Sequence, residues 1–363
     1  MKYTLILGIL VTVSLHAQDR KIIFPDIPGY QTLVCDLHIH TAFSDGSVWP
    51  DIRVKEAIFD GVDAISLTEH LEYQPHKADI PHKDRNRSYQ LAKAYAKGKD
   101  LIVIHGAEIT RSMPPGHANA LFINDANKLL QKDPMDAFLE AQKQGAFVFW
   151  NHPNWIDQRE DGIATMTDMH QELIDKGLLH GIEVVNETTY SDEALQHAYD
   201  QNLTVIGTSD IHGLIDWLFD IPGGGHRPVT LVFSTAKTEE GIKDGLINRR
   251  TVAWHRNSLI GEAQYVESLV MSSLKVSKLE YIRKSRVARI RISNTSDANY
   301  IMQNRSEFTL HENTDVFTIP SQGEIELQVK TLEELSTIEL SLEVLNTVIS
   351  PGKHATISLT TGN

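Results

Sequence analysis

The sequence predicts an α/β domain followed by a small all-β domain, and two patterns carry this prediction. Up to about residue 265, short apolar runs alternate with amphipathic segments that stop at glycine, as in parallel β/α architecture. From about residue 266, runs of alternating apolar and polar residues take over, separated by turn residues. The chain has 363 residues, more than a single core usually serves, so we expect domains at 18–265 and 266–363.

In chain order, the first expected strand includes 33–35 and leads into the segment 36–45. A helix is expected to begin at Trp49-Pro50 and to end at Gly61, because proline is favoured in the first turn and glycine after the last. Further strands are expected at 62–67, 101–105, 146–150, 181–185, 203–207 and 229–233, with an apolar run at 118–123. Helices are expected at 88–97, 133–144, 168–176, 192–201 and 239–248.

The second domain is expected to be an antiparallel β-sandwich. Its strands are predicted at 287–292, 324–329, 338–345 and 356–359, where apolar residues recur at every second position. His311 and His354 lie in this region outside any cluster of metal-ligating residues, so we interpret them as structural or exposed.

Residues 1–17 have the pattern of a secretory signal peptide. Lys2 is followed by an apolar run at 5–15, and Ala17 is a small residue suited to cleavage before Gln18. We therefore expect the protein to be exported, either to a periplasm or outside the cell. The run is shorter than the ~20 residues of a membrane span, and no second run predicts one.

The acidic composition restricts the possible partners. The formal net charge of −14 argues against broad binding of nucleic acid, which requires a basic surface. A small phosphorylated substrate remains compatible, because bound cations can reverse the local potential. Cys35 is the only cysteine, so no internal disulfide can form, and its apolar neighbours indicate a buried side chain. No pattern indicates a particular oligomeric state.

Metal-ligating side chains recur where the predicted strands end. His38 and His40 are two residues apart at the end of a strand, so their side chains point the same way and can chelate one ion. The same kind of residue recurs at later strand ends or in the loops beside them: Asp45, His70, Glu108, His117, His152, Asp210 and His212. In an α/β barrel these ends converge on one face, which carries the chemistry.

Nine such side chains are too many for one tetrahedral ion, which takes about four ligands, and they suit two or three divalent ions with a bridging carboxylate. Mixed imidazole and carboxylate ligation favours zinc, manganese or iron. Clustered cations of this kind support phosphoester hydrolysis by a metal-activated water. We therefore predict no catalytic residue beyond that water, and we find neither a glycine-rich phosphate loop nor a Gly-x-Ser-x-Gly elbow.

The motifs at these strand ends resemble the polymerase and histidinol phosphatase (PHP) family of metal-dependent phosphoesterases. The resemblance covers roughly residues 30–255 and is carried by the blocks 36–46, 68–70, 151–153 and 207–212, together with Glu108 and His117. It implies a distorted seven-stranded barrel and a site that holds up to three metal ions, and hence the hydrolysis of a phosphoester, most simply a small phosphomonoester.

The resemblance also implies an allocation of the ligands. His38, His40, Glu108 and Asp210 would hold one ion; Glu108, His117 and His152 a second; and Asp45, His70 and His212 a third. The chain departs from the family at Glu69, where aspartate is usual, and we interpret Glu69 as a residue that orients a metal ligand.

Several residues near these motifs are further candidates. Arg227, just before the last predicted strand, could bind a phosphate with two hydrogen bonds. Asp36 is interpreted as a support for the ligands or as a structural residue. His76 and His82 lie in a loop, and Trp155 and Trp217 follow ligand motifs; we consider contact with substrate for these four alongside ordinary solvation or packing.

Two alternatives to phosphoester hydrolysis remain at this point. Amidohydrolases also place His-x-His at a strand end and cleave amides or lactones, often with a carbamylated lysine as the bridge; Glu108 occupies that position here, which favours the phosphoesterase. The other alternative is a metal-binding module without turnover, in which the β-sandwich performs the recognition.

Overall fold

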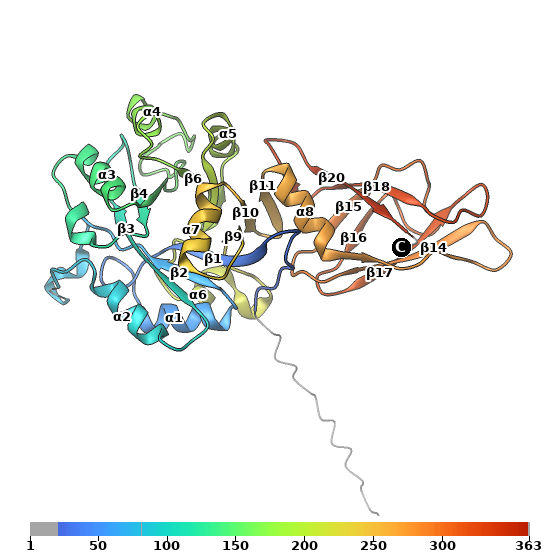
Figure 1. Cartoon of the computed structure of the whole chain (residues 1–363), viewed down its shortest axis with the longest axis horizontal. Coiled ribbons are helices and arrows are strands. Elements are labelled where there is room, and N and C mark those ends of the chain that lie inside the picture. Colours follow the sequence, from blue (N-terminus) through green and yellow to red (C-terminus); the bar gives the residue numbers. More distant parts are fainter. Residues whose placement is uncertain (1–20, 81, 362–363) are drawn as a thin grey trace, which may run out of the picture.

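The computed structural model describes residues 21–80 and 82–361, which form an α/β domain and an all-β domain along one elongated molecule (Figure 1). The predicted signal peptide, residues 1–17, lies outside the described residues. None of the helices in the described part has the length and apolarity of a membrane span.

One large sheet organises the first domain. Its strands are β1 (Gln31–Ile39), β2 (Ala64–Leu67), β3 (Ile102–Ile109), β4 (Ala118–Leu121), β5 (Phe147–Trp150), β6 (Gly181–Asn186), β7 (Thr189–Tyr190), β8 (Thr204–Thr208), β9 (Val229–Ser234), β10 (Thr251–His255) and β11 (Ser258–Gly261). Within the described residues they pair in the order β11-β10-β9-β1-β2-β3-β4-β5-β6-β7, and β8 pairs with β6.

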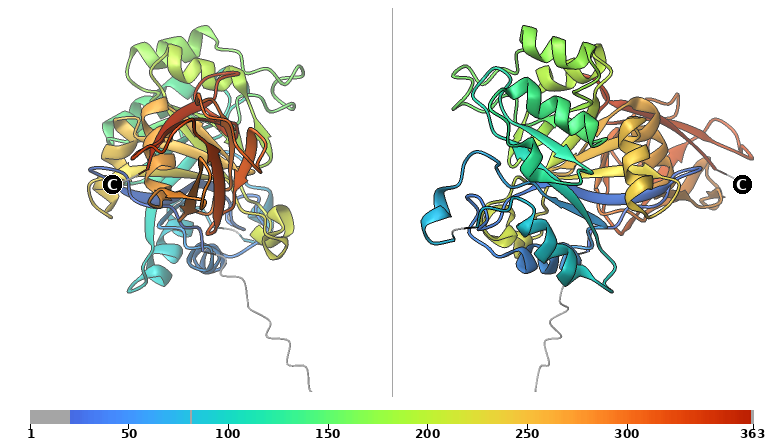
Figure 2. Two further views of the ribbon diagram at one scale, coloured as in Figure 1. Left: turned by 90° about the vertical axis from the view of Figure 1, so that its right-hand side faces the viewer. Right: turned by 60° about the vertical axis from the view of Figure 1, so that its left-hand side comes forward.

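The sheet is mixed, whereas the alternation in the sequence indicated parallel β/α architecture. β1, β2 and β3 run parallel, as do β5, β6 and β8. However, β4 is antiparallel to both β3 and β5, and β9 is antiparallel to β1. The predicted α/β fold is confirmed, with the sheet curled into a half-barrel (Figure 2).

The curl brings the ends of β1 and β8 together at the rim of the half-barrel. Ile39 and Ile211 form an isolated parallel bridge, and the His40 amide donates to the carbonyl of Ile211 at 3.1 Å. Inside the curl, Gly207 lets β8 approach β10, because a Cβ added at this position would lie 2.7 Å from the Cβ of Ala253. The carboxyl ends of β1, β2, β6 and β8 therefore face one region.

Helices flank this sheet on both sides. They are α1 (Pro50–Phe59), α2 (Arg87–Ala96), α3 (Pro134–Lys143), α4 (Asp168–Asp175), α5 (Asp192–Asp200), α6 (Ile215–Phe219), α7 (Glu239–Ile247) and α8 (Ala263–Ser273), with 3₁₀ turns at Pro75–Ala78, Ala126–Leu129 and Ile221–Gly223. α1 packs against α2 at one end of the domain, and α3, α4 and α5 lie at the other end (Figure 1). α8 connects the two domains.

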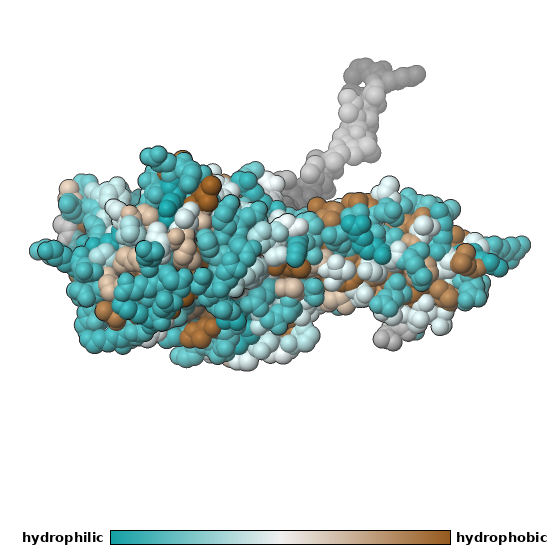
Figure 3. All heavy atoms as spheres, turned by 90° about the horizontal axis from the view of Figure 1, so that it is seen from above, coloured by the Kyte–Doolittle hydropathy of each residue, from teal (hydrophilic) through white to brown (hydrophobic). Residues whose placement is uncertain are grey.

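The second domain consists of two antiparallel sheets, as predicted. One contains β12 (Leu274–Val276), β13 (Glu280–Tyr281), β14 (Val287–Asn294) and β17 (Glu324–Lys330); the other contains β15 (Tyr300–Asn304), β16 (Val316–Ile319), β18 (Glu339–Val344) and β20 (Ala355–Thr360). The short strand β19 (Thr347–Val348) leaves this domain and pairs with β11, so it extends the large sheet. Seen from above, the surface of both domains is mainly hydrophilic, with small scattered hydrophobic areas (Figure 3).

Candidate metal centre

The loop after β1 places the first ligands. Gly46 lets this loop fold back on itself, because an added Cβ would lie 2.8 Å from the backbone of His40 and Thr41. Glu69 accepts hydrogen bonds from Thr41 and Ser44 in the same loop, with its Oε2 2.5 Å from Ser44 Oγ. The Glu69 side chain therefore holds the loop that carries Asp45, and its backbone carbonyl accepts from the amide of Glu108 at 3.0 Å.

Three side chains from the end of β1 and from the turn after β8 meet in a first cluster, formed by His38, His40 and Asp210. The two Nε2 atoms of the histidines are 3.0 Å apart. Asp210 Oδ1 lies 3.1 Å from His38 Nε2 and 3.0 Å from His40 Nε2. All three side chains are buried, so this triangle is shielded from solvent.

Glu108 is the centre of a second cluster, formed by His70, Glu108 and His117. Its Oε2 lies 2.6 Å from His70 Nδ1, and its Oε1 lies 2.7 Å from His117 Nδ1 and 3.7 Å from His152 Nε2. The same Oε2 is 3.6 Å from His40 Nε2, so the Glu108 carboxylate spans the space between this cluster and the first.

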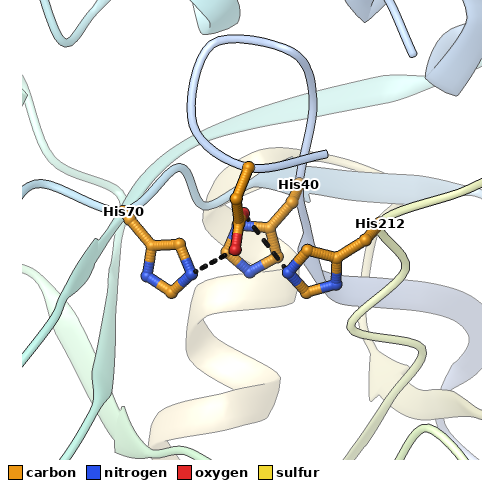
Figure 4. A group of neighbouring side chains, drawn as sticks. His40, His70 and His212 are labelled. Carbon is orange, nitrogen blue, oxygen red and sulfur yellow. Dashed lines mark ion pairs between the residues drawn. The ribbon is translucent and has the colours of Figure 1, made fainter. Parts of the chain in front are cut away.

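The third cluster surrounds Asp45 with His40, His70 and His212. Figure 4 shows the three imidazoles turned toward one carboxylate, with ion pairs drawn from His70 and His212. The distances are 3.2 Å from His70 Nε2 to Asp45 Oδ2 and 3.3 Å from His212 Nε2 to Asp45 Oδ1. The structure thus brings all nine predicted side chains together, although His40 and His70 each take part in two clusters.

The donor atoms fit divalent cations. Asp210 Oδ1 and Glu108 Oε2 are buried, and neither has a hydrogen bond of good geometry among the described residues. Buried carboxylate oxygens are almost always satisfied by hydrogen bonds or by metal ions. Here the atoms around them are imidazole nitrogens, which carry a lone pair when neutral, so a cation would satisfy both partners at once.

The pKa values reflect the same crowding of charge. Burial would raise the pKa of the Glu108 carboxyl, but the imidazoles of His70 and His117 hold it well below its usual range. Burial would lower the pKa of His70, yet Glu108 and Asp45 outweigh it and raise that pKa to about 10. Burial, with His212 and His70 beside it, lowers the pKa of His40 to about 3. Protons and cations therefore compete for one set of atoms.

The three clusters lie at the floor of a cavity of about 870 Å³. Asp45, His70, His117, His152, Asp210 and His212 contribute to its lining. Trp155, which the sequence indicated as a candidate, forms part of the wall and packs edge-on against His152, with ring centroids 5.1 Å apart. Tyr73, whose ring centroid lies 5.7 Å from that of His70, is also part of the lining and is half exposed.

Arg227 does not face this cavity, which corrects the prediction of a phosphate contact. Its guanidinium is buried, with Nε 2.9 Å from Asp60 Oδ2 and Nη1 3.1 Å from Asp36 Oδ2. Asp36 also accepts hydrogen bonds from the amide and hydroxyl of Ser209. The N–H groups of the Arg227 guanidinium are therefore hydrogen-bonded to carboxylates. Asp36 has a structural role, because it links β1 to the Ser209–Asp210 turn.

The remaining sequence candidates lie away from the cavity. His76 and His82 are not among the residues that line it, and the ring of His82 packs against Phe43. Trp217, in α6, is 76% exposed and does not line it either. Among the described residues, Trp155 is thus the one member of this group that reaches the site.

The structure adds polar residues that the sequence did not single out. Glu183, in the middle of β6, is buried and lies 2.8 Å from His38 Nδ1. Asn151 donates to Glu108 Oε1 at 3.0 Å, and Thr110 Oγ1 lies 2.7 Å from His70 Nδ1. The only sequence signal for Glu183 is a charged residue inside an otherwise apolar strand.

Comparisons with known families agree with this geometry. The profile of the PHP domain matches residues 36–218, and that of an Ig-like domain matches residues 274–360. No match was found among curated proteins.

Solved structures of similar proteins include a two-domain protein from Bacteroides vulgatus that contains a predicted PHP-like metal-dependent phosphoesterase. It is 39% identical, with a TM-score of 0.88 over 94% of this chain and 98% of that one. A putative metal-dependent phosphoesterase from Bifidobacterium adolescentis is 16% identical, with a TM-score of 0.39 over 51% of this chain and 90% of that one.

Proposed function

Because the chain belongs to the PHP domain family, we propose that it is a metal-dependent phosphoesterase that hydrolyses a small phosphomonoester. The observation that carries the proposal is the convergence of three His/Asp/Glu clusters on the floor of one cavity. The donors are imidazoles and carboxylates alone, which suits zinc, manganese or iron, and their number suits two or three ions.

We assign the chain's own side chains to three tasks. His38, His40, Glu108 and Asp210 would hold one ion; Glu108, His117 and His152 would hold a second; and Asp45, His70 and His212 would hold a third. When bound, these ions supply an activated water and neutralise the charge that develops on the phosphoryl oxygens. The cavity wall contributes the contacts to the organic part of the substrate.

The size and lining of the cavity support a small substrate. A volume of about 870 Å³ is within the range of pockets for small molecules. Trp155 is 39% exposed and Tyr73 is 53% exposed, so both offer apolar surface beside the ligand histidines. Among the described residues that line the cavity, Arg111 is the one arginine and there is no lysine; Arg111 Nη2 is already 2.7 Å from Glu72 Oε1. Within the described residues, recognition of the phosphate thus falls to the metal ions.

An amidohydrolase-like reaction on a lactone or amide is the second candidate. Enzymes of that kind often bridge their metals through a carbamylated lysine, as noted above. Glu108 occupies the bridging position, and none of the described residues that line the cavity is a lysine. This observation favours the phosphoesterase.

The test is an assay of the chain after controlled loading with metal. The protein is stripped with a chelator, reloaded separately with zinc, manganese or iron, and assayed on a phosphomonoester, a phosphodiester and a lactone. We expect metal-dependent release of phosphate from the monoester and its loss in His38→Ala and Asp210→Ala. His354→Ala, in the second domain, is the matched control and should keep full activity. Turnover of the lactone alone, or phosphatase activity that persists in both variants, would overturn the assignment.

We further propose that the protein is exported after removal of residues 1–17, on the basis of the basic start and the apolar run described above. Expression in a bacterial host followed by cell fractionation and N-terminal mass determination tests this. A protein that begins at Gln18 in the exported fraction is expected, and an intact start in the cytoplasmic fraction would contradict it.

A further inference from the structure

The buried carboxylate of Glu183 contacts four hydrogen-bonding groups around the candidate metal centre. Its Oε1 lies 2.8 Å from His38 Nδ1 and accepts from Thr208 Oγ1 at 2.6 Å. Its Oε2 accepts from the backbone amide of His152 at 2.7 Å and from Asn186 Nδ2 at 2.9 Å. The side chain is 1% exposed, so these groups replace the water that an exposed carboxylate would bind.

Each of three groups links Glu183 to a different metal-ligating residue. His38 is linked through its own ring, and His152 through its backbone. Asp210 is linked through Asn186, whose Nδ2 also donates to Asp210 Oδ2 at 3.1 Å. These ligands come from β1, from the end of β5 and from the end of β8, so one carboxylate in β6 connects three elements of the half-barrel.

Two of the linked ligands have unusual backbone conformations. His152 has a backbone φ of 27° and Asp210 a φ of 45°, and residues other than glycine rarely adopt positive φ values. Conformations of this kind persist when surrounding contacts hold them, and they occur frequently at functional sites. The hydrogen bond from the His152 amide to Glu183 is such a contact.

The contact with His38 also determines which ring nitrogen is free. A carboxylate can only accept a hydrogen bond, so the proton of a neutral His38 resides on Nδ1, opposite Glu183 Oε1. The lone pair is then on Nε2, which faces His40 and Asp210 in the first cluster. Carboxylate groups that orient metal-binding histidines in this way raise metal affinity.

We propose that Glu183 is a positioning residue that holds His38, His152 and Asp210 in the geometry and, for His38, the tautomer that metal binding requires. The proposal rests on the metal-binding part of the proposed function and not on its substrate. The proposal concerns the ion of the first cluster (His38, His40 and Asp210) and the ion to which His152 would bind. It does not concern the ion held by Asp45, His70 and His212, which have no hydrogen bond to Glu183.

Glu183→Gln is the informative variant because glutamine has nearly the same shape. A carboxamide offers one acceptor oxygen and one donor nitrogen in place of two acceptors. If the nitrogen faces His38, it forces the proton of His38 onto Nε2 and removes the lone pair from the cluster. If it faces His152, two donors oppose each other across a buried contact. Glu183→Asp keeps the charge on a shorter side chain and should restore part of the function.

The experiment is a zinc titration of the metal-free protein against a chromophoric chelator, with the bound metal counted after gel filtration. We expect Glu183→Gln to bind at least one zinc ion about 10- to 100-fold more weakly than the native protein while another ion is retained. Glu183→Asp should lie between the two. Asp60→Asn, which alters a buried carboxylate hydrogen-bonded to Arg227, is the control and should lower stability without changing zinc affinity.

Zinc affinity in Glu183→Gln equal to that of the native protein would overturn the proposal, as would equal weakening of every bound ion. If Glu183→Gln does not fold, Asn186→Ala decides, since it removes only the link to Asp210; a several-fold loss of zinc affinity supports the proposal, and unchanged affinity overturns it. Because the readout is metal binding, a failure to hydrolyse phosphomonoesters would refute the proposed function and leave this inference standing.

Discussion

The buried ion pairs of Arg227 allow a sharp test of its role. Its guanidinium is 1% exposed, and its partners Asp36 and Asp60 are 0% and 2% exposed. Arg227→Met keeps much of the side-chain volume and removes three N–H donors, of which Nη2 is 2.5 Å from Asp60 Oδ2. Two buried carboxylates then lose their hydrogen bonds and ion pairs to this guanidinium.

Removal of one partner from a buried ion pair costs about 3–5 kcal/mol, because the remaining charge stays buried. With a urea slope of at least about 3 kcal/mol per M, the unfolding midpoint should fall by up to roughly 1.7 M. The same substitution at Arg305, whose exposed guanidinium pairs with Glu343, should cost no more than about 1 kcal/mol. Combining Arg227→Met with Asp60→Asn should recover part of the lost stability, since a neutral amide then replaces one of the two buried carboxylates.

Urea unfolding followed by circular dichroism measures these differences, and phosphatase assays of the folded variants give the second readout. If Arg227 is structural, turnover per folded molecule should stay close to that of the native protein. A loss of stability as small as that of Arg305→Met, together with a tenfold rise in KM, would refute this reasoning and restore a phosphate contact.

Three further changes test other parts of the structure. Glu108→Gln should abolish phosphatase activity and release at least one ion, as counted by elemental analysis, because Glu108 lies between two clusters. Gly207→Val should destabilise the fold by several kcal/mol in urea unfolding, because its Cβ would lie 2.7 Å from that of Ala253. Burial lowers the pKa of His170 to about 4 in the folded protein, whereas the unfolded chain has the usual value of about 6.5. The stability that depends on neutral His170 is therefore complete above about pH 6.5 and is lost as the pH falls toward 4. Thermal unfolding between pH 7 and 4 should show this loss, and the loss should be smaller in His170→Gln.

The sequence allowed the ligands to be predicted because each lies at or near a strand end. His38 is followed by one more residue of β1, and Asp210 comes two residues after β8, so the alternation of apolar runs and loops was enough to place them on one face. The direction of a short strand is a different matter. The sequence Ala-Asn-Ala-Leu at Ala118–Leu121 does not indicate in which direction the strand runs, and its antiparallel pairing with β3 and β5 is seen only in the tertiary structure.

Arg227 and Glu183 show the limit of sequence reasoning for single residues. Arg227 follows a histidine and precedes a strand, which made it resemble a site residue, yet its partners lie 167 and 191 positions away. Glu183 appeared to be one charge in an apolar strand, and its four hydrogen-bond partners come from β1, the end of β5, the end of β6 and β8. Residues that act by orienting others are defined by tertiary contacts, so spacing in the chain carries little information about them.

The contact between the two domains determines whether they unfold together, and hence how these stability measurements are interpreted. β19 of the second domain pairs with β11 of the first, and Asn346 donates from Nδ2 to the carbonyls of Asn257 and Asn299. One cluster of buried apolar side chains also runs from Val54 in α1 to Leu342 in β18. Because hydrogen bonds and apolar packing both continue across the junction, loss of structure in one domain exposes surface of the other. We therefore expect a single unfolding transition, which is the condition under which a free-energy difference for Arg227→Met is well defined.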